Sequence, residues 1–132
     1  MGTKASRAHA RFSVKWPVTY WNEGLFGHGT ILDISHLGCQ MVGTMPVAEG
    51  MILKLWISPP QRENRLSAEG ARVLWSKGYE FGLELRNMFP DDRQWFNRYL
   101  ELAERRNSYR KLAQPPSPED LAAMPLALPL ID

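Results

Sequence analysis

Two groups of side chains in the N-terminal third of the chain have the types and spacing to bind a charged ligand. The first is a pair of arginines four residues apart, Arg7 and Arg11. A guanidinium fork can donate paired hydrogen bonds to phosphate oxygens, or to the O6 and N7 atoms of guanine. The second is the run DISHLG over residues 33–38, which has the form D-x-S-x-x-G. The arginine pair alone is a weak signal, because a chain with eleven arginines often places two of them four residues apart.

Each fixed position of the second group has a possible role in binding. The Asp33 carboxylate can accept hydrogen bonds from the N1–H and N2–H₂ groups of guanine, a donor pair that adenine lacks. Ser35 provides a small hydroxyl at a strand end, and Gly38 permits a tight turn and close approach of the backbone to a ligand. The alternative is an ordinary turn, because Asp and Ser side chains often bond to nearby backbone amides. The run alone favours the turn, and binding is favoured only when the run and the arginines occur together within a matching six-strand pattern.

Other candidate residues point to neither catalysis nor metal binding. Trp75 could stack on a base, although packing in the core is at least as good an interpretation. His36 and Cys39 have H-x-x-C spacing with His28 upstream, but zinc sites usually need four ligands. Ser35 does not lie in the G-x-S-x-G motif of a hydrolase nucleophile. In addition, no acidic residue is evidently placed to orient a histidine base. We therefore expect no metal, no cofactor and no enzymatic activity.

The charge distribution indicates a local anionic partner. The net charge is only +2, yet Lys4, Arg7, Arg11 and Lys15 all precede the first acid, Glu23. A basic arm on a near-neutral body suits a small anion better than a nucleic-acid polymer, although a solvated terminus is the simpler alternative. A barrel that binds single-stranded nucleic acid would need a basic groove with several exposed aromatic residues. We expect no nucleic-acid polymer as partner.

The chain carries no signal for export or membrane insertion. Its single cysteine excludes an intrachain disulfide, which fits a reducing cytosol. No apolar run reaches the roughly 18–20 residues that span a bilayer, and the N-terminus lacks the apolar stretch of a signal peptide. These features predict a cytoplasmic protein.

The elements that must position these residues are mostly short strands. The last predicted strand alternates, with Tyr79, Phe81, Leu83 and Leu85 on one face, which is the period expected when one face packs on a core. Residues 76–78 have the composition of a hairpin turn, and Pro17 indicates an edge or a bulge. Repeated short strands separated by turns predict a small antiparallel barrel. The six predicted strands cover residues 14–21, 29–34, 39–42, 51–57, 66–75 and 79–86.

A helix is predicted from Asp91 to about Leu112. Asp91 and Asp92 suit the positive end of its dipole, and an apolar stripe recurs at helical spacing. The stripe is interpreted as core, with partner binding as the less favoured use. Its members are Trp95, Tyr99, Leu102 and Ala103.

The expected organisation is a basic arm over residues 1–12, a barrel with its helix over 13–112, and a tail over 113–132. The tail is rich in proline, so we expect it to be disordered. Its apolar part, residues 121–131, could be a docking segment or could lie on the barrel.

This arrangement of motifs resembles the PilZ domain family of cyclic di-GMP receptors. The resemblance covers about residues 6–105. Beyond the arginine pair and the D-x-S-x-x-G run, residues 50–55 look like the middle strand of that family. Residues 71–75 and 79–85 look like its closing hairpin, although Leu85 stands where many members carry Phe. The resemblance implies a mainly β fold, a six-stranded antiparallel PilZ-type barrel with a C-terminal helix.

The resemblance also implies a function. Cyclic di-GMP would order the N-terminal arm and change the surface that the protein presents to a protein partner. The alternative is a PilZ-like interaction or assembly protein that binds no ligand. One or two ligands per site are both possible. The residues implied in ligand binding are Arg7, Arg11, Asp33, Ser35, Gly38 and Trp75.

Overall fold

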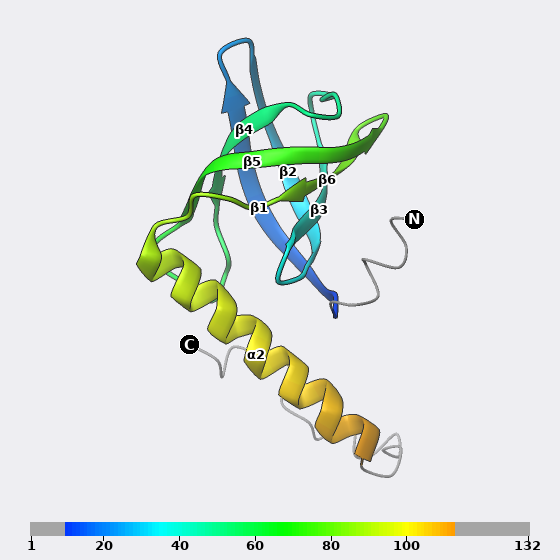
Figure 1. Ribbon diagram of the computed structural model, residues 1–132, viewed down its shortest axis with the longest axis vertical. Coiled ribbons are helices and arrows are strands. Elements are labelled where there is room, and N and C mark those ends of the chain that lie inside the picture. The colour runs from blue at the N-terminus through cyan, green and yellow to red at the C-terminus, as the bar shows by residue number, and fades with distance from the viewer. Residues whose placement is uncertain (1–9, 113–132) are drawn as a thin grey trace.

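Six antiparallel strands followed by one helix make up the part of the chain that the computed structural model describes, residues 10–112 (Figure 1). Each predicted strand is present, with ends that differ by a few residues, and the helix begins at Pro90. The elements are β1 Phe12–Asn22, β2 Leu25–Ile34, β3 Gly38–Gly43, β4 Ile52–Ile57, β5 Leu66–Lys77, β6 Glu80–Glu84 and α2 Pro90–Leu112.

The strands close into a barrel in the order β1-β2-β3-β6-β5-β4. Closure pairs the strand edges, which would otherwise expose unpaired backbone groups. It joins β3 to β6 and β1 to β4, which are not neighbours in the sequence. Pro17 lies in β1 just outside the β4 pairing, which begins at Val18. Its carbonyl accepts a hydrogen bond from the Ser58 amide at 2.9 Å, so the missing N–H of the proline falls at the end of the β1–β4 ladder rather than at a free edge.

The barrel core is built from alternating strand residues. In β6 and just beyond it, Phe81, Leu83 and Leu85 are buried, as the sequence predicted. The prediction for Tyr79 was wrong, because that side chain is 55% exposed. Lys77 pairs with Glu80, so Gly78 and Tyr79 form the turn. Gly78 has a φ of 63°, which places the turn slightly later than the predicted 76–78.

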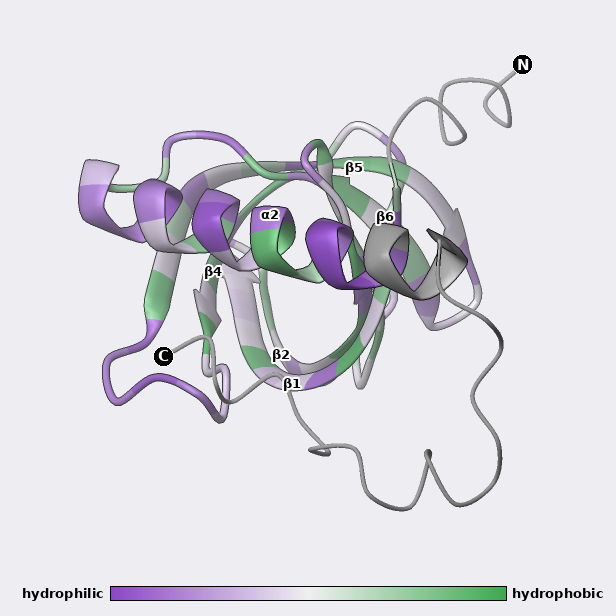
Figure 2. Ribbon diagram, turned by 90° about the horizontal axis from the view of Figure 1, so that it is seen from below, coloured by the Kyte–Doolittle hydropathy of each residue, from purple (hydrophilic) through white to green (hydrophobic). Residues whose placement is uncertain are grey.

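Helix α2 lies across one end of the barrel (Figure 2). Tyr99 and Ala103 of the predicted stripe are buried, as are the flanking Phe96 and Leu100, whereas Trp95 and Leu102 are partly buried. The Trp16 ring of β1 lies 5.2 Å from the Tyr99 ring in an edge-to-face contact. The aromatic stripe of the helix is therefore core, as predicted.

Asp92 fastens the start of the helix to the barrel. Its carboxylate accepts hydrogen bonds from the Arg62 guanidinium at 2.9 Å and from the Ser67 backbone amide at 2.9 Å. The carboxylate is nearly buried, and the guanidinium also lies 5.5 Å from the centre of the Trp95 ring. This ion pair fixes the loop before β5 against the first turn of α2.

The predicted arm and tail lie almost wholly outside the described residues. Within residues 10–112, no helix is long and apolar enough to cross a membrane.

Candidate functional site

The turn between β2 and β3 holds the D-x-S-x-x-G run. The Ser35 amide donates to the Gly38 carbonyl at 2.8 Å. The Ser35 hydroxyl is almost buried and accepts hydrogen bonds from the amides of Leu37 and Gly38, each at 3.3 Å. These contacts are those of an ordinary turn, so Ser35 shapes the backbone directly after Asp33.

Gly38 is required by the approach of β3 to β6. A Cβ atom at this position would lie 1.8 Å from the Leu83 carbonyl oxygen and 3.0 Å from the Glu84 Cα. Both neighbours are backbone atoms, so no side-chain rotation could relieve the contact. The glycine lets β6 pair with β3 at this point, which makes it part of the barrel closure.

Asp33 directs its carboxylate outward, where it meets Arg11. Arg11 Nη2 lies 2.8 Å from Asp33 Oδ1 and 3.3 Å from Gln40 Oε1. The side chains of Arg11 and Asp33 are 40% and 22% exposed. Solvent therefore reaches a guanidinium that lies within hydrogen-bonding distance of both a carboxylate and an amide.

A row of outward positions joins this cluster to Trp75 across four strands. Asp33 in β2 pairs with Gln40 in β3, and Gln40 pairs with Gly82 in β6. Gly82 in turn pairs with Trp75 in β5. Three steps between strands correspond to about 14 Å along the surface, so one nucleotide-sized ligand can contact the whole row. We call Asp33, Gln40, Gly82 and Trp75 the outer row.

A bulge in β5 places Trp75 on this surface. Ala71 and Val73 face the core, and strict alternation would send Trp75 there as well. The pairing with β6 shifts by one residue between Val73 and Trp75, and both Leu74 and Trp75 are exposed, at 45% and 38%. A bulge of this kind redirects the following side chain. The interpretation of Trp75 as a core residue was therefore wrong.

The Trp75 indole lies directly over Gly82. A Cβ atom on Gly82 would be 2.2 Å from the indole Nε1, so the ring occupies the space that a side chain would fill. Gly82 is buried although it is on the outer face, because Trp75 covers it. The pyrrole part of the ring therefore covers Gly82, while the Trp75 side chain as a whole remains partly exposed.

Cys39 lies beneath the cluster and is chemically inert. Its side chain is buried, and burial, with a smaller contribution from the Asp33 carboxylate, raises the pKa of the thiol to about 12, while Arg11 lowers it. A neutral thiol is a poor nucleophile and a poor metal ligand. Among residues 10–112, no three His, Cys, Asp or Glu side chains gather closely enough to hold a metal ion.

The structure brings together four of the residues singled out from the sequence, namely Arg11, Asp33, Ser35 and Gly38, and places Trp75 in the same row. Arg7 lies outside the described residues. Gln40 and Gly82 were missed. Alternation after Gly38 places Gln40 on the face opposite Cys39, which could have identified it, but the neighbourhood of Gly82 depends on the pairing of β3 with β6.

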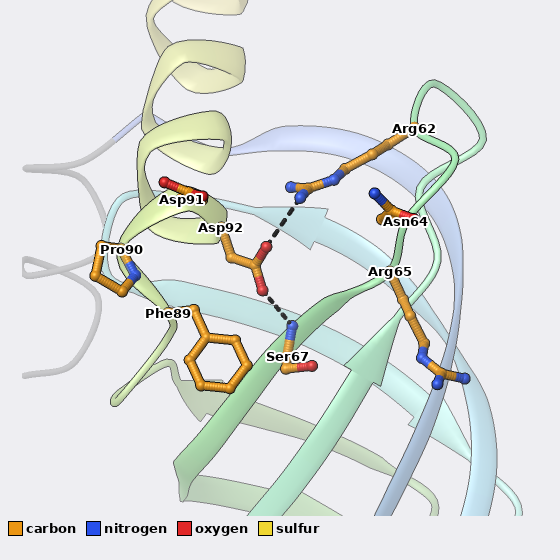
Figure 3. Close-up of a pocket in the computed structure, with 8 residues that line it drawn as sticks. All are labelled: Arg62, Asn64, Arg65, Ser67, Phe89, Pro90, Asp91 and Asp92. Carbon is orange, nitrogen blue, oxygen red and sulfur yellow. Dashed lines mark hydrogen bonds and ion pairs between the residues drawn. The ribbon is translucent and has the colours of Figure 1, made fainter.

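A separate cavity of about 570 Å³ opens beside the start of α2 (Figure 3). It shares no residue with the outer row. The Arg62–Asp92 ion pair and the Asp92–Ser67 hydrogen bond cross it (Figure 3). These contacts fix the helix to the barrel, and we assign the cavity no ligand. Its lining residues are Arg62, Asn64, Arg65, Ser67, Phe89, Pro90, Asp91 and Asp92.

Residues 5–102 match the PilZ domain family. Among curated proteins nothing matches. Among solved structures, the Bacillus subtilis inhibitor of motility (MotI/DgrA) is similar, with a TM-score of 0.58 and 20% sequence identity. The similarity covers 77% of this chain and 51% of that protein, so the chain spans about half of its length. At this identity the likeness establishes the shared fold.

Proposed function

The chain belongs to the PilZ domain family, and on that premise we propose that it is a receptor for cyclic di-GMP. One observation carries the proposal. The fold gathers an exposed guanidinium, a carboxylate and an indole along one row of the barrel surface.

Each group suits a different part of the ligand. The Arg11 guanidinium, together with Arg7 from the arm, would neutralise the phosphodiesters or bind the O6/N7 edge of guanine. The Asp33 carboxylate would accept from guanine N1–H and N2–H₂. The partly exposed Trp75 ring would stack on a base, a contact worth about 1–3 kcal/mol. Ser35 and Gly38 would act indirectly, by holding the turn that presents Asp33.

The existing pair between Arg11 and Asp33 does not oppose binding strongly. An exposed ion pair contributes about 0.2–1 kcal/mol, whereas micromolar binding corresponds to about 8 kcal/mol. Rearranging or sharing Arg11 therefore costs little. In this proposal the ligand draws the N-terminal arm onto the outer row, and a protein partner binds the changed surface. The protein acts by binding in the cytoplasm and has no enzymatic activity.

One observation favours a second candidate, a PilZ-like interaction or assembly protein without a ligand. Arg11 already has two partners on its own barrel, Asp33 and Gln40. When the charged groups of a surface already bond to one another, an added ligand gains less free energy by binding to them. The two candidates differ in a direct measurement of binding.

The test is calorimetric titration with cyclic di-GMP, with GTP, cyclic GMP and cyclic di-AMP as controls. We expect a dissociation constant in the micromolar range or below for cyclic di-GMP alone. The absence of heat at tens of micromolar ligand would leave the interaction protein as the better account.

Variants then test the site. Arg11→Ala and Asp33→Ala should each weaken binding at least about 10-fold, because each removes charge-assisted hydrogen bonds. Arg98→Ala is the matched control, since Arg98 is an exposed arginine on α2. Wild-type affinity in both site variants would disprove the assignment even if the protein binds the ligand.

A further inference from the structure

Gln40 occupies the position next to Asp33 in the outer row. The two residues pair directly across β2 and β3, and outward side chains at such positions lie about 5 Å apart at Cβ. On its other side Gln40 pairs with Gly82, which has no side chain of its own. The Gln40 amide therefore stands between the Asp33 carboxylate and the Trp75 indole that covers Gly82.

Arg11 determines which way the Gln40 amide faces. A guanidinium can only donate hydrogen bonds, so the atom that lies 3.3 Å from Arg11 Nη2 must be the amide oxygen. The amide nitrogen is left as a donor. Neither Gln40 Nε2 nor Asp33 Oδ2 has a hydrogen-bond partner among residues 10–112. The surface thus presents a carboxylate acceptor beside an amide donor.

We infer that Gln40 is a specificity-determining residue that donates a hydrogen bond from Nε2 to O6 of the guanine bound by Asp33. This rests on the proposed cyclic di-GMP site and deepens it. The Watson–Crick edge of guanine offers N2–H₂, N1–H and O6, two donors followed by an acceptor. Asp33 supplies the acceptor for the donors and Gln40 supplies the donor for O6. Adenine, with an amino group at C6 and a bare N1, mismatches both side chains.

Arg11 contributes to this recognition through Gln40. Its bond to Oε1 holds the amide with Nε2 available, and the same guanidinium holds Asp33 through Oδ1. The side chains that bind guanine are therefore ordered before the ligand arrives, which lowers the entropic cost of binding.

The test combines Gln40→Ala with a change in the ligand. Affinities of the wild type and the variant are measured for cyclic di-GMP and for its 6-thioguanine analogue. The analogue keeps both donors that Asp33 accepts and replaces O6 by sulfur, a weak acceptor. Gln94→Ala, at an exposed position on α2, is the matched control and should bind as the wild type does. Thermal unfolding verifies that each variant is folded.

We expect Gln40→Ala to weaken binding of cyclic di-GMP about 3- to 10-fold, the value of one hydrogen bond. For the thio analogue the same variant should change affinity less than twofold, since the partner atom is already impaired. An equal loss with both ligands would overturn the inference, because Gln40 would then act only by holding Arg11. Wild-type affinity of the variant for cyclic di-GMP would overturn it as well.

These outcomes are distinct from failure of the proposed function. If the wild type bound neither ligand, the receptor proposal and the role of Gln40 would both fall. If the wild type bound cyclic di-GMP and Gln40→Ala did not differ, only the role of Gln40 would fall.

Discussion

Gly38 and Gly82 lie in adjacent strands of the same surface, yet substitution by alanine should affect different properties of the protein. A Cβ on Gly38 would meet the Leu83 carbonyl oxygen at 1.8 Å, whereas a Cβ on Gly82 would meet the Trp75 indole at 2.2 Å. The first obstacle is backbone and the second is a side chain that is 38% exposed. We predict that Gly38→Ala reduces stability and that Gly82→Ala reduces ligand binding.

The size of each predicted effect depends on which atoms the new Cβ displaces. Ordinary van der Waals contact begins near 3.4 Å, so Gly38→Ala must separate β3 from β6 by more than about 1 Å. This would break about two ladder hydrogen bonds at about 1 kcal/mol each and loosen the packing of Leu83. We expect a loss of about 3 kcal/mol in the free energy of unfolding, or about 10 °C in Tm.

Gly82→Ala requires only that the indole swing away from the sheet. Because Trp75 is on the outer face, the free energy of unfolding should fall by less than about 1 kcal/mol. The displaced ring could no longer stack on a base, and loss of about 1–3 kcal/mol of stacking corresponds to roughly 5- to 150-fold weaker binding.

Chemical denaturation and calorimetric titration separate the two outcomes. Both are measured for the wild type, the two glycine variants, Trp75→Ala and the Gly82→Ala/Trp75→Ala double variant. The double variant should bind no more weakly than Trp75→Ala alone, since both changes remove the same contact. Wild-type affinity of a folded Gly82→Ala protein would refute the role of Trp75. Wild-type stability of Gly38→Ala would refute the close approach of β3 to β6.

Two further predictions concern the buried charges and the buried thiol. Asp92→Ala should lower the free energy of unfolding by about 3 kcal/mol in denaturant titrations, because it leaves the Arg62 guanidinium half-buried without its carboxylate. Restoration of stability by an added Arg62→Leu change would support this cause, and an unchanged midpoint for Asp92→Ala would contradict it. Burial raises the pKa of Cys39 from 9.0 to about 12, so the unfolded chain loses this proton at lower pH than the folded one. Stability should therefore fall by up to about 1.4 kcal/mol per pH unit between pH 9 and 12, and Cys39→Ala should show a smaller slope; identical slopes would mean that the thiol is not buried.

Local patterns in the sequence were sufficient to predict the elements and to place some residues of the candidate site within them. Period-two alternation identified the inward residues of β6, and helical spacing identified the buried stripe of α2, because these depend on the geometry of one element at a time. The D-x-S-x-x-G run placed Asp33 at a strand end for the same reason, since a turn is made by residues close in the chain.

Other features depended on which strands became neighbours. The sequence places β3 next to β4, but closure of the barrel pairs β3 with β6, and only this pairing sets Gln40 beside Gly82. Trp75 follows two inward residues at the correct alternation for the core, and the bulge at Leu74 turns it outward. A bulge is an adjustment between two strands, so one strand alone does not reveal it.

The sequence by itself therefore determined the chemical groups of this protein and the short segments that carry them. The tertiary structure determined which of these groups lie next to one another. It showed that Ser35 bonds within its own turn and that Gly38 lies against β6, left Arg11 and Asp33 accessible, and brought Gln40 and Trp75 to the same surface. The physical reason is that side-chain types and local turns are properties of neighbouring residues, whereas the outer row is produced by hydrogen bonds between strands far apart in the chain.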